Sequence, residues 1–518
     1  MFGISRRVAR IATGTALITG CSLYFVRRKY SQKGYISDRN VMLVEHLKKQ
    51  GERPPQIPKR ENMKLNLQKG AEYDLLIIGG GATGAGVALD AVTRGLKVAL
   101  VERDDFGSGT SSKSTKLLHG GVRYLEKAFR NLDYGQYKLV CEALKERANL
   151  LKISPHLSHE VPIMLPIYSW WKLPYYWLGA KVYDVLAGSQ ALESSYVLNK
   201  TKALEKFPML NTDNLKGAIV YYDGQHNDSR MNVSLILTAA SHGADVANHT
   251  EVIDLVKEER NGKETIVGAT VRDNITGEEW DVRAKGVISA VGPYADSLRK
   301  LADPRARDIV APSTGVHVVL PGHYGPKDMG LLDPETTDDR LLFFLPWQGH
   351  VVVGTTDVPT KLHFNPKPTE KEIAFILQEI QAYISPQLKV QRGDVLAAWS
   401  GIRPLVRDPN KPNTESLART HVVEVGPTKL LSITGGKWTT YRSMAKDTVD
   451  KALEVFGIEA AHDCLTEHVL LVGAHRFSNL GFLQLVQQFG IDSNVAQHLM
   501  HSYGDRAFDV VMHAKPTG

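Results

Sequence analysis

Three glycines and one acid between residues 79 and 102 have the types and spacing that hold a dinucleotide. Gly79, Gly81 and Gly84 form a G-x-G-x-x-G pattern, and Glu102 follows 23 residues after Gly79. Such glycines let the backbone approach a pyrophosphate at a helix N-terminus, and the acid accepts hydrogen bonds from ribose hydroxyls. The pattern predicts a dinucleotide site, and a purely structural tight turn is the alternative.

The elements around this motif have the order that such a site needs. Residues 73–78 are an apolar run that ends in glycines, as a buried parallel strand does. Small and apolar residues keep helical spacing over 82–93, and an apolar run at 97–101 predicts a second strand before Glu102. The sequence therefore predicts a β-α-β unit with the glycines at its first turn.

The rest of the chain alternates in the same mixed manner. We expect helices over 132–153 and 371–384, and four prolines after residue 153, Pro155, Pro162, Pro166 and Pro174, are interpreted as breaks in regular structure. Further strands are expected over these ranges: 246–256, 266–272, 279–284, 286–291, 316–320, 341–345 and 350–354.

At this point the sequence resembles the FAD-dependent glycerol-3-phosphate dehydrogenases of the mitochondrial type. Five strings carry the resemblance in order: YDLLIIGGGATGAGVALDAVTRGLKVALVERDDFGSGTSSKSTKLLHGGVRYLE, VISAVGPYAD, VVVGTTD, SGIRPL and SITGGKWTTYRSMA. The resemblance implies a mixed α/β fold, with a glutathione-reductase-like FAD-binding domain beside a substrate domain that has an antiparallel sheet. It also implies oxidation of sn-glycerol 3-phosphate to dihydroxyacetone phosphate, with hydride passing to flavin N5 and electrons to ubiquinone at the inner mitochondrial membrane.

Several residues in these strings are candidates for holding FAD. The hydroxyl-rich loop after Glu102 offers donors for the diphosphate and the flavin edge, and a solvated loop is the alternative. The family's last motif places a helix N-terminus at the flavin. Besides Gly79, Gly81, Gly84 and Glu102, the candidates are Ser108, Thr110, Ser111, Ser112, Gly292, Gly436, Lys437 and Thr439.

A phosphomonoester substrate needs fixed cations, and its hydroxyl proton needs a base. By resemblance Arg123, Arg403 and Lys437 are assigned to the phosphate and substrate oxygens, although a surface ion pair is the ordinary role of a lone arginine. His317 is the candidate base, and a buried core histidine is the equal alternative. Weaker candidates for substrate contact are Tyr124, Thr356 and Arg419, followed by His119.

The domain organisation expected from these motifs is discontinuous. FAD-binding segments are predicted at 71–155, 216–300 and 396–460, a membrane-proximal insertion at 156–215 and the substrate domain at 301–395. Residues 1–42 are expected to be a transit peptide or membrane anchor, 43–70 a linker, and 461–518 the start of a shortened C-terminal helical domain. We expect a helix such as 493–512 to fray without further partners, and no calcium regulation, because no EF-hand loop appears in the sequence.

Composition indicates a globular protein and argues against a nucleic-acid partner. The 518 residues are 43% hydrophobic and 23% charged, with a net charge of +7. Seven basic residues and no acid precede Asp38, which is typical of a mitochondrial presequence. Removing those seven from the 63 basic residues leaves 56, the same as the number of acidic residues. Three scattered cysteines predict neither a disulfide framework nor a metal site.

Three questions stay open at the level of sequence: the role of an aromatic cluster, the activity and the oligomeric state. Six aromatic residues between Tyr168 and Trp177 are interpreted first as a core or loop cluster, with a monotopic membrane contact as the alternative. The chain could also be an FAD-dependent amine or amino-acid oxidase of the same fold, or a shortened flavin-binding product without turnover. A homodimer is a further possibility.

Overall fold

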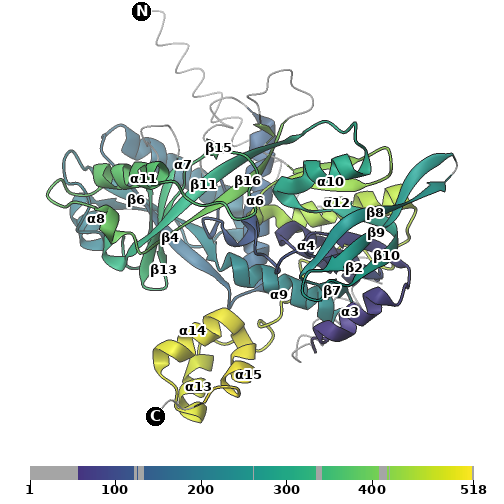
Figure 1. The fold of residues 1–518 in the computed structure, drawn as a ribbon. Helices are drawn as coiled ribbons and strands as arrows, with labels where there is room; N and C mark the ends of the chain where they lie inside the picture. The colour runs from purple at the N-terminus through teal and green to yellow at the C-terminus, as the bar shows by residue number, and fades with distance from the viewer. Residues whose placement is uncertain are drawn as a thin grey trace, which may run out of the picture. The chain divides into compact units, whose positions relative to one another are not determined.

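The computed structural model describes residues 56–121, 125, 133–260, 262–333, 341–407, 417–418 and 421–515 (Figure 1). The predicted presequence, together with Arg123, Tyr124 and Arg419, lies outside the described residues. Within the described part, the chain forms two large β-sheets with helices packed against them.

The first sheet is the core of the predicted dinucleotide-binding unit. Among the described residues its order is β18 (His421–Val425), β19 (Leu431–Gly435), β10 (Glu279–Ser289), β1 (Tyr73–Ile78), β2 (Val98–Val101) and β7 (Asp245–Ala247). All neighbours except β18 and β19 pair in parallel. The strand predicted at 73–78 is confirmed, and so is the helix α4 (Ala82–Thr93) that follows it. β1 and β2 are continuous apolar runs because the sheet is buried on both faces at these strands.

A three-stranded antiparallel ribbon extends from this sheet. β8 (Thr250–Arg260) pairs with β9 (Lys263–Asp273), and β9 pairs with the first half of β10. The sequence analysis split β10 into two strands, but the chain runs through as one. The reason is a change of partner, since 279–283 pair with β9 whereas 284–289 pair with β1.

The second sheet is mixed and mostly antiparallel. Its described strands are, in order, β17 (Leu417–Ala418), β16 (Ala397–Arg407), β11 (Val310–Pro321), β14 (His350–Gly354), β13 (Leu342–Trp347), β12 (Gly330–Asp333), β4 (Ser158–Ile167), β6 (Gly217–His226) and β3 (Leu117–Leu118), with β15 (Val358–Pro359) on β11 and β5 (Tyr196–Asn199) on β6. Neighbouring residues of β12 face opposite cores, because Leu331 packs in one apolar cluster and Leu332 in the other. The expected pairing of an FAD-domain sheet with an antiparallel substrate sheet is therefore confirmed.

The described helices cover these sheets. α4, which follows the glycine turn, packs against both α9 and α12. In chain order the remaining described helices are α3 (Arg60–Gln68), α6 (Tyr134–Ile153), α7 (Lys172–Ala187), α8 (Lys200–Lys206), α9 (Asp228–Ser241), α10 (Ala295–Ala302), α11 (Glu370–Tyr383), α12 (Tyr441–Phe456), α13 (Gly481–Phe489), α14 (Ser493–Tyr503) and α15 (Ala507–Val511).

The interpretation of the four prolines after residue 153 as breaks in regular structure is confirmed for Pro155, which lies in a turn after α6, and was wrong for the other three. Pro162 and Pro166 lie inside the ten-residue strand β4, and Pro174 lies in the first turn of α7. β4 pairs along its length with β6, but with β12 only at Ile163 and Met164. Pro162 and Pro166 therefore interrupt no hydrogen-bond ladder between β4 and β12. Pro174 costs α7 no hydrogen bond, because a backbone N–H in the first turn of a helix has no acceptor within the helix.

Two strands that lie within the predicted FAD-binding segments belong to the second sheet. β6 falls within the segment 216–300 and β16 within 396–460, yet both strands belong to the second sheet. The difference arises because pairing partners lie far apart in sequence, as between β11 and β16. Apolar patterning identifies such strands but not the sheet that they join.

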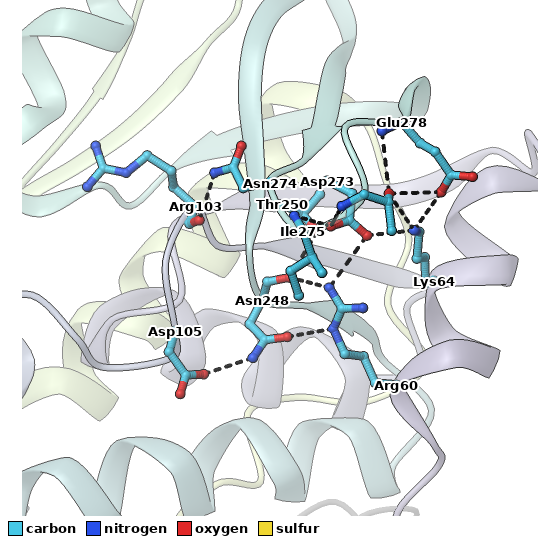
Figure 2. A network of polar contacts seen from close by, with 11 residues as sticks. Arg60, Lys64, Arg103, Asp105, Asn248, Thr250, Asp273, Asn274, Ile275 and Glu278 are labelled. Atoms are coloured by element: carbon cyan, nitrogen blue, oxygen red, sulfur yellow. Dashed lines mark hydrogen bonds and ion pairs between the residues drawn. The ribbon is translucent and has the colours of Figure 1, made fainter.

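Part of the predicted linker is a helix docked on the first sheet. α3 buries Met63 and Leu67, and its basic side chains tie it to the ribbon (Figure 2). Lys64 is 2.5 Å from the fully buried Asp273, and Arg60 donates to Asn248 Oδ1 at 2.8 Å. Asn248 in turn donates to Asp105 at 2.8 Å. We call these side chains the α3 clasp.

The C-terminal helices α13, α14 and α15 form a small cluster, drawn in yellow in Figure 1. Leu485, Ala496 and Met500 are buried in a core of their own. The helix expected over 493–512 is broken at Gly504, which has φ +59° and lies close to the backbone of Gly473. None of the helices in the described ranges combines the length and apolar character that a membrane span requires.

Candidate active site

A cavity of about 1620 Å³ lies where the two sheets meet. Its lining includes the residues that follow the carboxyl ends of four parallel strands, β1, β2, β10 and β19. From the second sheet, β11 and β16 add the side chains of His317 and Arg403. Ligands of open α/β sheets bind at the carboxyl ends of the strands, so the position fits a cofactor and a substrate together.

The glycine turn has the shape of a dinucleotide cradle. Gly79 has φ +106°, and a Cβ there would lie 2.7 Å from the carbonyl oxygen of Ala290. A Cβ at Gly84 would lie 1.9 Å from the carbonyl oxygen of Gly79, so this glycine serves close packing of helix on strand. Gly81 is the N-cap of α4 and has no side chain, the first turn carries no acid, and Gly81, Ala82 and Thr83 at this positive helix end line the cavity.

Glu102 is held beside this turn by two backbone donors. Its Oε2 accepts from Gly80 N at 2.7 Å, and its Oε1 accepts from Asp104 N at 3.0 Å. Burial raises the pKa of the Glu102 carboxyl, and the two backbone hydrogen bonds oppose that shift. Each oxygen keeps a second lone pair for a ligand hydroxyl.

The hydroxyl-rich loop connects the cradle to the second sheet. Ser111 Oγ accepts from Ala82 N at 2.9 Å, and Trp438 Nε1 donates to Ser111 O at 2.8 Å. Thr110 Oγ1 donates to Ile402 O at 2.6 Å, which brings β16 to the loop. Ser108, Gly292, Gly436, Lys437 and Thr439 also line the cavity.

One candidate of this loop is corrected. Ser112 is absent from the cavity lining, and its hydroxyl donates to Gly109 O at 3.2 Å. Successive side chains of the 3₁₀ turn Thr110–Ser112 are about 120° apart around its axis, so neighbouring hydroxyls point in different directions.

The candidate phosphate cations are Arg403, which lies inside β16, and Lys437, which follows the end of β19. Arg403 donates to Thr356 O and to Thr355 Oγ1, both at 3.0 Å, and lies 3.2 Å from Asp357. Lys437 follows two glycines with φ +83° and +74°, a turn that returns the chain to the cavity. Thr356 also lines the cavity, and its buried hydroxyl accepts from Val316 N and donates to Glu372.

His317 lines the cavity but is poorly suited to be a base. Its ring stacks on Trp399 with centroids 5.3 Å apart, and its Nε2 is 3.0 Å from Thr115 Oγ1. Burial, with the charges of Arg403 and Lys116, lowers the pKa of His317 to about 3. The ring is therefore neutral at physiological pH and binds a proton weakly.

His119, the weakest candidate from sequence, lines the cavity and is paired with a buried acid. Its Nδ1 is 2.7 Å from Oδ2 of the fully buried Asp223, and its Nε2 has no hydrogen-bond partner among the described residues. The side chain lines the cavity. Sequence gave no signal for this pair, because Asp223 lies 104 positions away on β6.

Lys113 is a second residue that the sequence analysis left unassigned. It lines the cavity, and burial lowers the pKa of its amine. A Cβ at Gly401 would lie 2.9 Å from the Cβ of Lys113, so the lysine lies directly against β16 near Arg403. The hydroxyl loop therefore contributes a cation as well as neutral donors.

Comparison with known proteins agrees with this arrangement. Residues 74–442 match the family described as FAD dependent oxidoreductase, and residues 464–518 match the C-terminal domain of alpha-glycerophosphate oxidase. A protein of Caenorhabditis elegans named "Probable glycerol-3-phosphate dehydrogenase, mitochondrial" is 55% identical over 99% of this chain and 70% of its own length. The Mesocricetus auratus protein "Glycerol-3-phosphate dehydrogenase, mitochondrial" is 59% identical over 89% of this chain, which spans 64% of that relative.

A solved structure supports the same conclusion. The glycerol-3-phosphate dehydrogenase of Bacillus halodurans, in complex with FAD, is 29% identical with a TM-score of 0.69, covering 88% of this chain and 80% of its own. The names of the eukaryotic relatives support a mitochondrial location. The cradle, the family match and the relatives agree, and the chain belongs to the FAD-dependent glycerol-3-phosphate dehydrogenase family, with FAD as its cofactor.

Proposed function

We propose that this chain oxidises sn-glycerol 3-phosphate to dihydroxyacetone phosphate and passes the electrons to ubiquinone at the inner mitochondrial membrane. The observation that carries the proposal is one cavity lined by the dinucleotide cradle, by Arg403 and Lys437, and by His119. Two cations in one cavity suit the dianionic phosphate of glycerol 3-phosphate better than the single carboxylate of an amino acid or an uncharged amine.

The cationic residues and the histidine have different roles in the proposed reaction. Arg403 and Lys437 bind the phosphate, and their positions on β16 and after β19 hold the substrate carbon against the cofactor side of the cavity. His119 Nε2 accepts the proton of the substrate C2 hydroxyl as the C2 hydride leaves, so the alcohol becomes a carbonyl. Bound FAD supplies the two-electron acceptor.

A second part of the proposal concerns the membrane. Trp170, Trp171, Tyr175, Trp177 and Leu178, here called the α7 aromatic surface, are exposed, with Trp170 68% and Trp171 67% accessible. The interpretation as a core cluster therefore fails for these exposed side chains, although Tyr168 and Tyr176 do pack against apolar cores. Lys172 and Lys216 lie over two of the indole rings. Exposed aromatics with basic neighbours suit the interface of an anionic lipid bilayer, where the quinone is dissolved.

Anaerobic flavin reduction tests the reaction. Glycerol 3-phosphate should bleach the flavin of the purified holoenzyme, whereas glycerol and glycine should do so far more slowly. His119→Gln should lower the reduction rate by about 10²- to 10⁴-fold, and His317→Gln should lower it much less. Bleaching by glycine but not by glycerol 3-phosphate would favour the amine oxidase, and no bleaching by any substrate would favour a product without turnover.

Vesicle sedimentation tests the membrane surface. The double variant Trp170→Ser, Trp171→Ser should bind vesicles of phosphatidylcholine and phosphatidylglycerol more weakly and reduce a quinone in those vesicles more slowly. Leu480→Ser is the matched control, because Leu480 is 65% exposed but lies next to α13. Equal vesicle binding by the double variant and the control would contradict the proposal.

A further inference from the structure

A buried acid lies directly behind His119. Asp223 is fully buried on β6, and its two oxygens are used differently. Oδ1 accepts from Arg147 and from the Tyr183 hydroxyl, both at 2.7 Å, and from Gly120 N at 3.1 Å. Oδ2 contacts His119 Nδ1 at 2.7 Å.

The strand register brings these groups together. β3 pairs with β6 so that Leu118 is opposite Gly224 and the next residue, His119, lies beside Asp223. A Cβ at Gly120 would lie 2.0 Å from the Tyr183 hydroxyl, so a glycine is required for this close approach. Arg147 comes from α6 and Tyr183 from α7, and both are buried.

The carboxyl of Asp223 is ionised. Burial alone would raise its pKa, but the hydrogen bond and charge of His119, the charge of Arg147 and the Tyr183 hydroxyl together lower the pKa. An ionised carboxylate only accepts hydrogen bonds, so Nδ1 of His119 must carry the proton. In the neutral form of the ring the lone pair is then on Nε2, the nitrogen that has no protein partner among the described residues.

We propose that Asp223 is the positioning residue of His119, and that Arg147 and Tyr183, by holding Oδ1, turn Oδ2 toward the histidine and so fix its tautomer. This inference rests on the proposed function, because it assigns the orientation of the group that accepts the substrate proton. When that proton arrives at Nε2, the carboxylate also stabilises the resulting imidazolium.

Asp223→Asn tests the proposal, because the surrounding donors determine how the new amide is oriented. The three donors at Oδ1 keep the amide oxygen on their side, so the new NH₂ group faces His119 and donates to Nδ1. The proton of the ring then moves to Nε2, which can no longer accept. We expect the limiting rate of flavin reduction by glycerol 3-phosphate to fall by about 10²- to 10⁴-fold, with little change in the substrate concentration at half saturation.

The matched control is another buried acid that does not touch the cavity. Asp273 is fully buried and paired with Lys64 in the α3 clasp (Figure 2). Asp273→Asn should lower stability but leave the limiting rate within about twofold of the wild type. An equal loss of rate in both variants, or an Asp223→Asn rate near that of the wild type, would overturn the proposal.

A measurement on the wild type covers the case in which Asp223→Asn loses its flavin. In ¹⁵N-histidine spectra of the oxidised holoenzyme, with the His119 signal identified by its loss in His119→Gln, Nδ1 should be protonated and Nε2 should not. The reverse tautomer would overturn the proposal. Because these spectra need no turnover, they remain decisive for positioning even if glycerol 3-phosphate fails to reduce the flavin, which would refute only the proposed function.

Discussion

The two sides of the cavity differ in how far apart their partners lie in the sequence. On the cofactor side Glu102 accepts from Gly80, 22 positions away, inside one β-α-β unit. On the substrate side His119 contacts Asp223 across 104 positions and His317 contacts Thr115 across 202. The difference teaches that local spacing identifies the cofactor side, whereas only the pairing of distant strands assembles the proposed catalytic side. The four predictions below test whether the two sides fail independently.

The largest effect is expected at the cofactor side. In Gly84→Val the added side chain has no space, since even a Cβ would lie 1.9 Å from Gly79 O, so we expect protein without bound flavin. Gly81→Val meets only Ser111 Oγ, at 3.0 Å, and should fold yet bind FAD weakly. Flavin absorbance after purification measures both. Gly179→Ala, with open space around it, is the control, and a Gly84→Val protein with full flavin would show that the turn is not a cradle.

A change at the substrate side should leave the cofactor in place. Arg403→Ala should lower kcat/KM for glycerol 3-phosphate by roughly 10²-fold, because a charge-assisted contact to the phosphate is lost, and much less for glycerol. Flavin content should stay at the wild-type level. Arg392→Ala, which breaks only an exposed pair with Glu370, is the control. A similar loss on both substrates would mean that Arg403 is structural.

Buried histidines give the protein a defined response to acid. Burial lowers the pKa of His317 to about 3 and that of His226 to about 4. The unfolded chain therefore binds protons that the folded chain excludes, and stability is lost as pH falls from about 6.5 toward 4, by up to about 1.4 kcal/mol per pH unit for each histidine. Urea unfolding at pH 7.5, 6.5 and 5.5 measures this, and His226→Gln should flatten the slope. An unchanged slope would refute the assignment.

The smallest effect is expected away from both sides. Lys64→Ala removes one partner of Asp273, which keeps Arg60 at 3.7 Å and hydrogen bonds from the backbone N–H groups of Ile275 and Thr276. The melting temperature should fall by about 2–4 °C with flavin reduction unchanged. Lys69→Ala, at the exposed end of α3, is the control. A reduced rate in Lys64→Ala would show that the α3 clasp acts on the cavity.

Several elements were predictable from the sequence because their signals are local. The strand 73–78, the helix 82–93 and the strand 350–354 have the bounds that apolar periodicity gives. The capping box at Thr369 and Glu372 begins α11 within one residue of the expected start. The elements that were not predicted depend on tertiary partners. β4 contains two prolines but is held by its pairing with β6, and α3 is held by acidic residues outside the helix.

By itself, the sequence determined the cofactor class and the family, because a glycine turn, an acid and ordered motifs are encoded within short stretches of chain. It could not decide which of His119 and His317, which both line the cavity, has surroundings suited to a base. His317 stands in a recognisable motif, yet Trp399 covers its ring and burial weakens it as a base. Only the tertiary structure places Asp223, Arg147 and Tyr183 behind His119, because hydrogen bonds between such distant residues require strands and helices that meet after folding.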